Sequence, residues 1–146
     1  MREILFRGKS ILGKWVEGLP YCEADGVIDC IRVKEQIQDI IFYTTHKVIP
    51  ETVGQHTGLI NRNGKKIFEG DIVKEEYEVF VSARAKEKRV KIGYVEYESN
   101  SLCCGYYAYF WNDKEKWRGN FAIHCGCEVI GNIHDNPELM KGGAEE

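Results

Sequence analysis

The stretch of this sequence that comes nearest to a chemical motif is residues 58–66, GLINRNGKK, which has the look of a phosphate-binding loop. In the Walker A pattern, G-x-x-x-x-G-K-[ST], backbone amides cradle phosphates, a lysine reaches the outer phosphates and a hydroxyl holds magnesium. Here five residues separate Gly58 from Gly64, and Lys66 stands where the hydroxyl belongs. No strongly periodic helix follows to direct its N-terminus at an anion. The spacing therefore argues against nucleotide binding.

The same residues fit a β-hairpin. Asn-Gly is the preferred dipeptide for a two-residue type I′ turn, because both central positions need a positive φ. A turn at Asn63-Gly64 would pair Ile60 with Ile67 and Leu59 with Phe68, which places the apolar pairs at the base of the hairpin. We therefore predict a hairpin over residues 58–68.

The cysteines are the second group of side chains that could do chemistry. The chain has six, at Cys22, Cys30, Cys103, Cys104, Cys125 and Cys127. His124, Cys125 and Cys127 could contribute to a tetrahedral zinc site, although the spacing does not match the usual zinc knuckles. No signal peptide precedes the first strand, so we expect free thiols in a reducing cytoplasm and no cofactor. A metal site at His124, Cys125 and Cys127 is the alternative.

Nucleophilic catalysis would need a cysteine or serine beside a partnered histidine. The four histidines are scattered along the chain, at His46, His56, His124 and His134. His124 and Cys125 are neighbours in sequence only, because adjacent side chains of a strand point to opposite faces. We therefore expect that the protein is not an enzyme. An enzyme of unknown class is a third interpretation, which a pocket containing His124 or His56 would favour.

The most charged segment is residues 84–91. It carries five basic side chains against one acidic one, and the basic residues are Arg84, Lys86, Lys88, Arg89 and Lys91. Such a segment could bind a nucleic-acid backbone, with nearby tyrosines as stacking surfaces. Acidic residues on the preceding strand, among them Glu75 and Glu78, would weaken the positive field. A solvated hairpin tip is thus the first interpretation and a nucleic-acid site the second.

The composition is that of a globular protein without membrane helices. The 146 residues are 43% hydrophobic and 29% charged with a net charge of −3, which is ordinary for a globular protein and gives no chain-wide reason to expect nucleic acid. No apolar run approaches the length of a membrane helix, so we expect no membrane partner.

The elements that would position these residues are mainly strands. Alternating apolar and polar positions predict strands at residues 4–7, 14–18, 71–81, 89–97, 106–111 and 127–133. A short helix around residues 32–38 is an open alternative, and Pro50 marks a boundary. We predict an N-terminal β-rich region (1–49), a C-terminal β-barrel domain (50–140) and a disordered tail (141–146).

The aromatic residues exceed what so small a barrel can bury. They are densest at Tyr106, Tyr107, Tyr109, Phe110, Trp111 and Trp117. Aromatic side chains are enriched at protein interfaces, so we expect some of them to lie between subunits of a homo-oligomer.

Three segments resemble the YopX family of phage and prophage proteins. They are IPETVGQHTGL with NGKKIFEGDIV (residues 49–59 and 63–73), REILFR with GKWV (2–7 and 13–16), and EVIGNIHDNPEL (128–139). The resemblance implies an N-terminal region followed by a C-terminal SH3-like β-barrel, an origin in a phage or prophage, and oligomeric assembly in the cytoplasm of a bacterial host. It implies no catalytic residues. We therefore expect a non-enzymatic accessory or interaction protein that forms homo-oligomers and binds an unknown phage or host protein.

Overall fold

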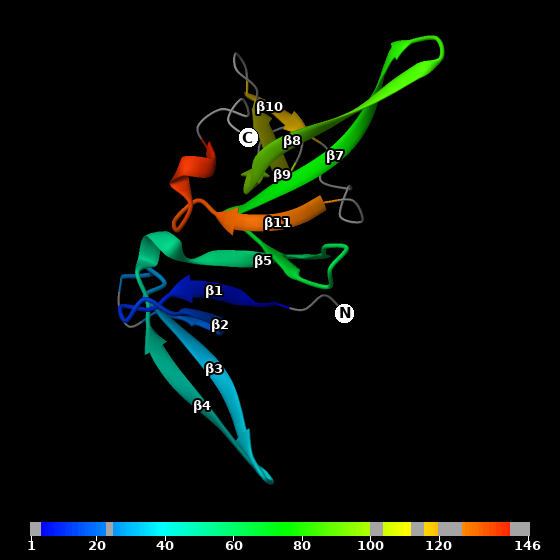
Figure 1. Ribbon diagram of the computed structural model, residues 1–146. Coiled ribbons are helices and arrows are strands. Elements are labelled where there is room, and N and C mark those ends of the chain that lie inside the picture. Colours follow the sequence, from blue (N-terminus) through cyan, green and yellow to red (C-terminus); the bar gives the residue numbers. More distant parts are fainter. Residues whose placement is uncertain (1–3, 23–24, 100–103, 112–115, 120–126, 141–146) are drawn as a thin grey trace. The chain divides into compact units, whose positions relative to one another are not determined.

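The protein is built almost wholly from antiparallel strands (Figure 1). The computed structural model describes residues 4–22, 25–99, 104–111, 116–119 and 127–140. Its strands are β1 (Phe6–Lys9), β2 (Trp15–Tyr21), β3 (Cys30–Ile37), β4 (Ile40–Lys47), β5 (Gly54–Ile60), β6 (Lys66–Phe68), β7 (Asp71–Ser82), β8 (Ala85–Ser99), β9 (Cys104–Trp111), β10 (Lys116–Gly119) and β11 (Cys127–Asn132). Two short 3-10 helices are η1 (Pro50–Thr52) and η3 (Pro137–Met140). The prediction of a mainly β fold is confirmed.

The described strands form two sheets. In the order of hydrogen-bonded neighbours, the first is β4-β3-β2-β1-β5-β6 and the second is β10-β9-β8-β7-β11. Among the described strands neither sheet closes on itself, so the predicted SH3-like barrel is not confirmed. A small barrel is built from short strands, whereas β7 has 12 residues and β8 has 15.

The chain separates into two compact units, Met1–Gly58 and Leu59–Glu146. The predicted domains, residues 1–49 and 50–140, stay a prediction, because a domain is defined by its ability to fold alone. The predicted tail, 141–146, lies outside the described residues.

The alternative of a short helix around residues 32–38 is wrong. β3 occupies this segment and pairs with β4 over its whole length, ending with Ile37 opposite Ile40. Gln38 then takes a φ of 54° and reverses the chain in two residues. Cross-strand pairing outweighs the brief helical pattern because a seven-residue helix without a partner is marginal in water.

In the first unit, β1 lies between β2 and β5. Its residues Phe6 to Lys9 pair with Gly18 to Trp15 on one side, and Phe6 and Arg7 pair with β5 on the other. The strands predicted at residues 4–7 and 14–18 are thus present as β1 and β2, and they pair with each other. The buried apolar side chains of this unit are Cys30, Ile31 and Val48.

Pro50 begins the 3-10 helix η1 of the first unit. The hydroxyl of Thr52 donates a hydrogen bond to the carbonyl of Ile49 (2.6 Å) and accepts one from the backbone N–H of Lys9 (2.9 Å). Thr52 is buried, with 7% of its surface exposed. The IPET segment therefore holds a turn against β1, which is a structural role.

The second unit has its core around β6, β7, β8 and β11. Ile67, Val73, Val95 and Cys127 are buried together, and Leu59 and Val129 pack against them. The turn that leads into β7 is held by the buried carboxylate of Asp71, which accepts a hydrogen bond from the backbone N–H of Phe68 (2.8 Å).

The hairpin predicted over residues 58–68 is present, but its turn has three residues, not two. The N–H of Asn61 donates to the carbonyl of Lys65 (2.9 Å), and the N–H of Gly64 donates to the carbonyl of Asn61 (3.0 Å). Gly64 has a φ of 80°, while Asn63 is not among the described residues with positive φ. This is the pattern of a type I turn followed by a left-handed glycine, so the predicted type I′ turn is wrong.

The extra turn residue changes the register by one position. With Asn61 opposite Lys65, Leu59 lies opposite Ile67 and Ile60 lies opposite Lys66. Leu59 accordingly packs against the core, while Ile60 is 52% exposed. The side chain of Asn61 selects this turn, because its Oδ1 accepts hydrogen bonds from the N–H groups of Asn63 and Lys65, both at 2.9 Å.

A second turn follows β11. The Oδ1 of Asn132 accepts hydrogen bonds from the N–H groups of His134 (3.0 Å) and Asp135 (2.9 Å), and the Oδ1 of Asn136 accepts one from the N–H of Asn132 (3.2 Å). A Cβ on Gly131 would lie 2.4 Å from the Asn136 Oδ1 atom. The GNIHDN segment is therefore an amide-capped turn.

Gly64→Ala should lower the free energy of unfolding by about 1–2 kcal/mol, because alanine resists the left-handed conformation. Asn63→Ala is the matched control one residue earlier, and it should change stability by less than about 0.5 kcal/mol. Urea denaturation of both variants measures the difference. Equal midpoints for the two variants would contradict the three-residue turn.

Candidate interaction surfaces

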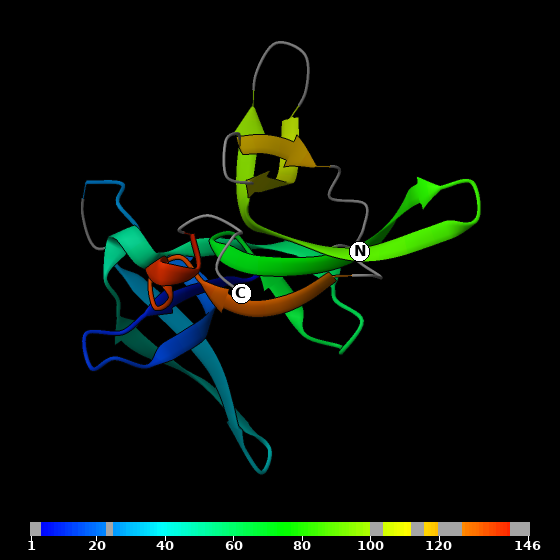
Figure 2. The same ribbon diagram turned by 45° about the horizontal axis from the view of Figure 1, so that its top comes forward.

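Two hairpins extend beyond the sheets to which they belong. The first arm is residues 32–45 of β3 and β4, and the second arm is residues 75–91 of β7 and β8. Figure 1 shows the turn of the first arm far from β1 and β2, and Figures 1 and 2 both show the tip of the second arm beyond β9 and β11. A two-stranded hairpin with no third strand or helix on its face is marginally stable in water. Both arms therefore have faces that a partner could cover.

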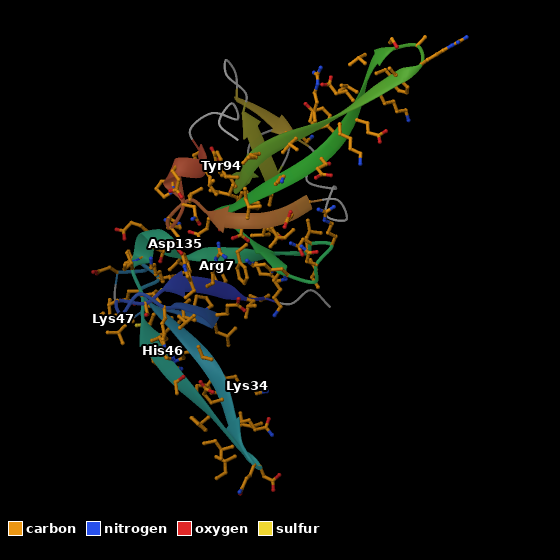
Figure 3. All side chains as sticks on the ribbon, viewed as in Figure 1. Arg7, Lys34, His46, Lys47, Tyr94 and Asp135 are labelled. Carbon is orange, nitrogen blue, oxygen red and sulfur yellow. The ribbon has the colours of Figure 1, made fainter. Side chains whose placement is uncertain are left out.

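The first arm carries apolar side chains at its outer end. The register places Ile37 opposite Ile40 and Glu35 opposite Phe42, so alternate residues of the two strands share one face. The exposed apolar residues of the arm are Ile37 (62%), Ile40 (67%), Ile41 (53%), Phe42 (36%) and Tyr43 (54%). Side chains project from both sides of the arm in Figure 3, where Lys34 is labelled. Ile37, Ile40 and Phe42 lie on one face of the arm, and Ile41 and Tyr43 lie on the other. The outer end of the arm, called the first-arm cluster below, therefore exposes large apolar side chains on both of its faces.

The inner end of that face is polar. The hydroxyl of Thr44 donates to the Glu35 carboxylate (3.4 Å) and lies 3.1 Å from the His46 Nε2 atom. These contacts join the two strands where the arm leaves the sheet. The apolar part of the face is thus confined to the outer end, near Gln38 and Asp39.

The second arm holds the five basic residues that the sequence identifies. All of them lie on β8 or on the turn before it: Arg84, Lys86, Lys88, Arg89 and Lys91. The strands predicted at residues 71–81 and 89–97 are longer in the structure, because Ser82 pairs with Ala85 and the ladder continues to the turn. The pairing extends because β-branched and aromatic residues, such as Val79 and Phe80, continue the strand pattern.

Carboxylates contact three of these basic residues. Lys91 lies 3.2 Å from Glu75, Lys86 lies 3.4 Å from Glu78, and Arg89 lies 3.2 Å from Glu87. Residues 75–91 contain five basic and four acidic side chains, so the arm has little net charge. Nucleic-acid binding by this arm stays a prediction, and the ion pairs reduce the positive field on which it depends.

Two of the lysines also cover aromatic rings of the arm. The Nζ of Lys86 lies 5.0 Å from the centre of the Phe80 ring, and that of Lys91 lies 5.5 Å from the Tyr77 ring. These are cation–π distances. On the ring faces that the lysines occupy, a base could stack only after the lysine moved away.

The candidate metal and catalytic residues are only partly described. Cys127 is fully buried in the core of the second unit, whereas His124 and Cys125 lie outside the described residues. His56 is buried in β5 with 3% of its surface exposed. Within the part of the chain that the structure describes, no three His, Cys, Asp or Glu side chains are grouped to hold a metal ion. The enzyme interpretation and the metal interpretation stay predictions.

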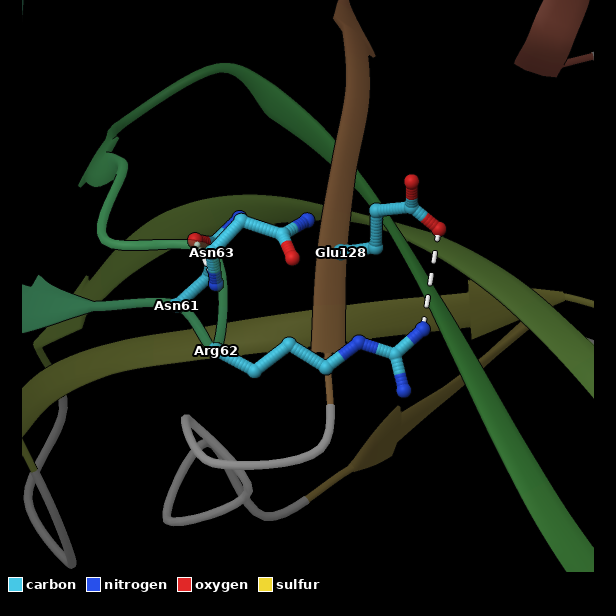
Figure 4. A network of polar contacts seen from close by, with 4 residues as sticks. All are labelled: Asn61, Arg62, Asn63 and Glu128. Atoms are coloured by element: carbon cyan, nitrogen blue, oxygen red, sulfur yellow. Dashed lines mark hydrogen bonds and ion pairs between the residues drawn. The ribbon is translucent and has the colours of Figure 1, made fainter.

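Residues 58–66, which have the look of a phosphate-binding loop, contain an arginine that forms an ion pair. Figure 4 shows Arg62, in the turn, facing Glu128 on β11 at 3.8 Å, with Asn61 and Asn63 beside it. Both charged side chains are partly exposed, so the pair adds little stability. The N–H groups of the turn donate to Asn61, and the turn has the geometry of a hairpin.

Sequence reasoning missed the first arm as a surface. Residues 40–43, Ile-Ile-Phe-Tyr, have the composition of a buried strand, and only the pairing shows that they are exposed. The aromatic residues that the sequence does identify lie on β9 and β10, where their side chains are outside the described part. Their role at a subunit interface stays a prediction.

Comparison with known proteins identifies relatives by sequence and by fold. A family model described as "YopX protein" matches residues 14–141. The crystal structure of protein EF1440 from Enterococcus faecalis is similar, with a TM-score of 0.57 and 22% sequence identity, covering 97% of this chain and 100% of that one. No protein with a curated description matches. None of the described helices is long and apolar enough to span a membrane.

We expect that the chain does not shift a single-stranded oligonucleotide at about 50 mM salt, because the arm is nearly balanced in charge. Glu75→Gln, Glu78→Gln and Glu87→Gln, combined in one variant, remove the carboxylate partners and should create a salt-sensitive shift. A gel mobility assay compares the two proteins. The expectation is wrong if the unmodified chain binds the oligonucleotide and this binding weakens steeply with salt. In that case, replacing the five basic residues by alanine should abolish the binding.

Proposed function

Since this chain belongs to the YopX family, we propose that it is a phage- or prophage-derived accessory protein that acts by binding proteins, without catalysing a reaction. It associates with copies of itself in the bacterial cytoplasm and offers its arms to a phage or host protein. The alternative is a nucleic-acid-binding module that uses the second arm, and the mobility assay above distinguishes the two.

The observation that supports this proposal is the exposure of large apolar side chains on the two arms. Besides the first-arm cluster, the second arm exposes Tyr77 (37%), Phe80 (73%), Val81 (54%) and Val90 (49%). Each arm has backbone pairing between its two strands, and among the described strands no third one runs along its outer part. Covering such a face with a partner would remove apolar surface from water, which stabilises both the arm and the complex.

The mixture of charges on the arms also supports a protein partner. The first arm carries two basic residues, Arg32 and Lys34, and two acidic ones, Glu35 and Asp39. The second arm is likewise mixed. Interspersed charges of both signs around an apolar centre are typical of protein–protein interfaces, whereas nucleic-acid sites are strongly positive.

Light scattering at micromolar concentration should give a molecular mass above the 16.8 kDa of the monomer. The combined variant Ile37→Ser and Ile40→Ser should weaken association about tenfold or more, since two apolar side chains leave the interface. Val27→Ser, at a residue that is 51% exposed and belongs to neither arm, is the matched control. Circular dichroism verifies that all variants fold.

A monomeric mass for the unmodified chain over the whole concentration range would refute self-association. Equal association of the Ile37→Ser and Ile40→Ser variant and the Val27→Ser control would place the contact away from the first arm.

A further inference from the structure

The two faces of the first arm differ in charge. Arg32 and Lys34 lie two residues apart on β3, so their side chains share one face. Glu35 follows Lys34 and points to the opposite face, where the hydroxyl of Thr44 donates to its carboxylate. Asp39, the other acidic residue of the arm, lies in the turn. Both basic side chains of the arm are thus on the face that Glu35 does not share.

The register adds a third basic residue to that face. Cys30 lies two residues before Arg32 on β3, and Lys47 of β4 is opposite Cys30. Lys47, Arg32 and Lys34 therefore occupy successive two-residue steps along the strands. Since an antiparallel strand advances about 3.4 Å per residue, neighbouring basic positions lie about 7 Å apart in the strand direction.

The exposed side chains on this side of β2, β3 and β4 form a surface that we call the basic face. It consists of Tyr21, Arg32, Lys34, Ile41, Tyr43 and Lys47, all of which are exposed. At the described positions of this side of the three strands, Glu17 is the one acidic residue, and the register places it opposite Arg7 of β1. The face therefore has a net positive charge, although the first arm as a whole is balanced.

Aromatic and apolar side chains flank the basic positions. The guanidinium carbon of Arg32 lies 4.3 Å from the centre of the Tyr21 ring, and Tyr43 is opposite Lys34 in the register. A guanidinium over a ring keeps its N–H groups at the rim of its plane, where a carboxylate can accept two hydrogen bonds from them. Ile41, which is 53% exposed, extends the face towards the tip of the arm.

We propose that the basic face binds an extended acidic segment of a partner protein. In an extended chain, alternate side chains share one side and are about 7 Å apart, so carboxylates at three alternate positions match the spacing of the three basic residues. The inference rests on the proposed protein-binding function and names the chemistry of the partner. Complementary charge at facing positions sets the register and the specificity of such a contact.

A nucleic acid fits the basic face less well. The chain has a net charge of −3, which repels a long polyanion, whereas a short acidic segment meets mainly the local field of the three basic groups. One face of the Tyr21 ring is covered by Arg32, which a base stacking there would have to displace. Leu19, on the same side of β2 and 47% exposed, offers apolar contact of the kind that peptide side chains use.

Fluorescence anisotropy of the full chain with two synthetic peptides tests the spacing. Both peptides have about ten residues and three glutamates among threonines and valines, and they differ only in the positions of the glutamates. The first has them at alternate positions and should bind at least about threefold more tightly than the second, which has them at every third position. Binding of the first should weaken between about 50 and 300 mM salt, because exposed ion pairs are screened.

Charge reversal tests the residues. Arg32→Glu and Lys34→Glu, combined in one variant, should weaken binding of the alternate-glutamate peptide at least about tenfold. Arg62→Glu and Lys65→Glu, in the turn at residues 61–65, make the same change in composition and charge and should leave the affinity within about threefold. A peptide with lysines in place of the three glutamates should bind the first variant at least about tenfold more tightly than the unmodified chain, which a loss of folding would not produce.

The inference is wrong if the unmodified chain does not bind the alternate-glutamate peptide, if both glutamate peptides bind equally, or if both double variants do. A thymidine oligonucleotide of about ten residues is the competing probe, because it presents phosphates and bases instead of carboxylates. If it binds more tightly than the peptide and the Arg32→Glu and Lys34→Glu variant loses it, the occupant is a nucleic acid. Loss of self-association in that variant, with no peptide binding by the unmodified chain, would assign the face to a second copy.

Light scattering separates this inference from the proposed self-association. An oligomeric chain that does not bind the alternate-glutamate peptide would overturn the acidic partner alone. A monomeric chain that binds the peptide would refute self-association alone.

Discussion

Pairing of backbone hydrogen-bonding groups is the constraint on which this structure depends. The described buried apolar side chains of the second unit are Ile67, Phe68, Ile72, Val73, Val95 and Cys127, and none of them lies on residues 75–91, the outer part of the 12-residue β7 and the 15-residue β8. The ladder between β7 and β8, like that between β3 and β4, supplies the remaining order. Each strand that extends beyond the core therefore stays paired with a neighbouring strand, and the outermost strand keeps an unpaired edge.

Side-chain oxygens satisfy the backbone where strands end. Thr52, Asn61 and Asp71 are all buried, and each accepts hydrogen bonds from N–H groups that the sheets do not pair. Removing such an acceptor would leave a buried donor without a partner, which costs about 1–3 kcal/mol. The segments that identify the family, around residues 49–73 and 128–139, contain these turns. Their sequence is thus explained by folding, and the surfaces that could bind partners lie elsewhere, on the arms.

The two arms differ in how they use charge. On the second arm, lysine and arginine side chains contact carboxylates of the same hairpin and cover its aromatic rings. On the first arm, the charged residues lie around an apolar tip, and the open backbone edge runs along one side. Both arms leave apolar side chains exposed, among them Phe80 (73%) on the second arm and Ile40 (67%) on the first, and the second arm adds ion pairs between its own strands.

Local pattern in the sequence was enough to predict the strand content and the presence of hairpins at residues 58–68 and around residues 84–91, because alternation and turn residues act over a few positions. It was not enough for the turn at Asn61–Lys65, where one buried amide favours a three-residue loop over the turn that Asn-Gly alone predicts. It also placed the ends of the strands at residues 81 and 89, short of the Ser82–Ala85 pair, and left the first arm unnoticed. Exposure depends on which strands have neighbours, and that is a property of the whole sheet. The sequence by itself determined which segments form strands and roughly where the chain turns between them. Only the tertiary structure decided the registers, the length of the arms and which strand edges stay open, because these depend on contacts between residues far apart in the chain.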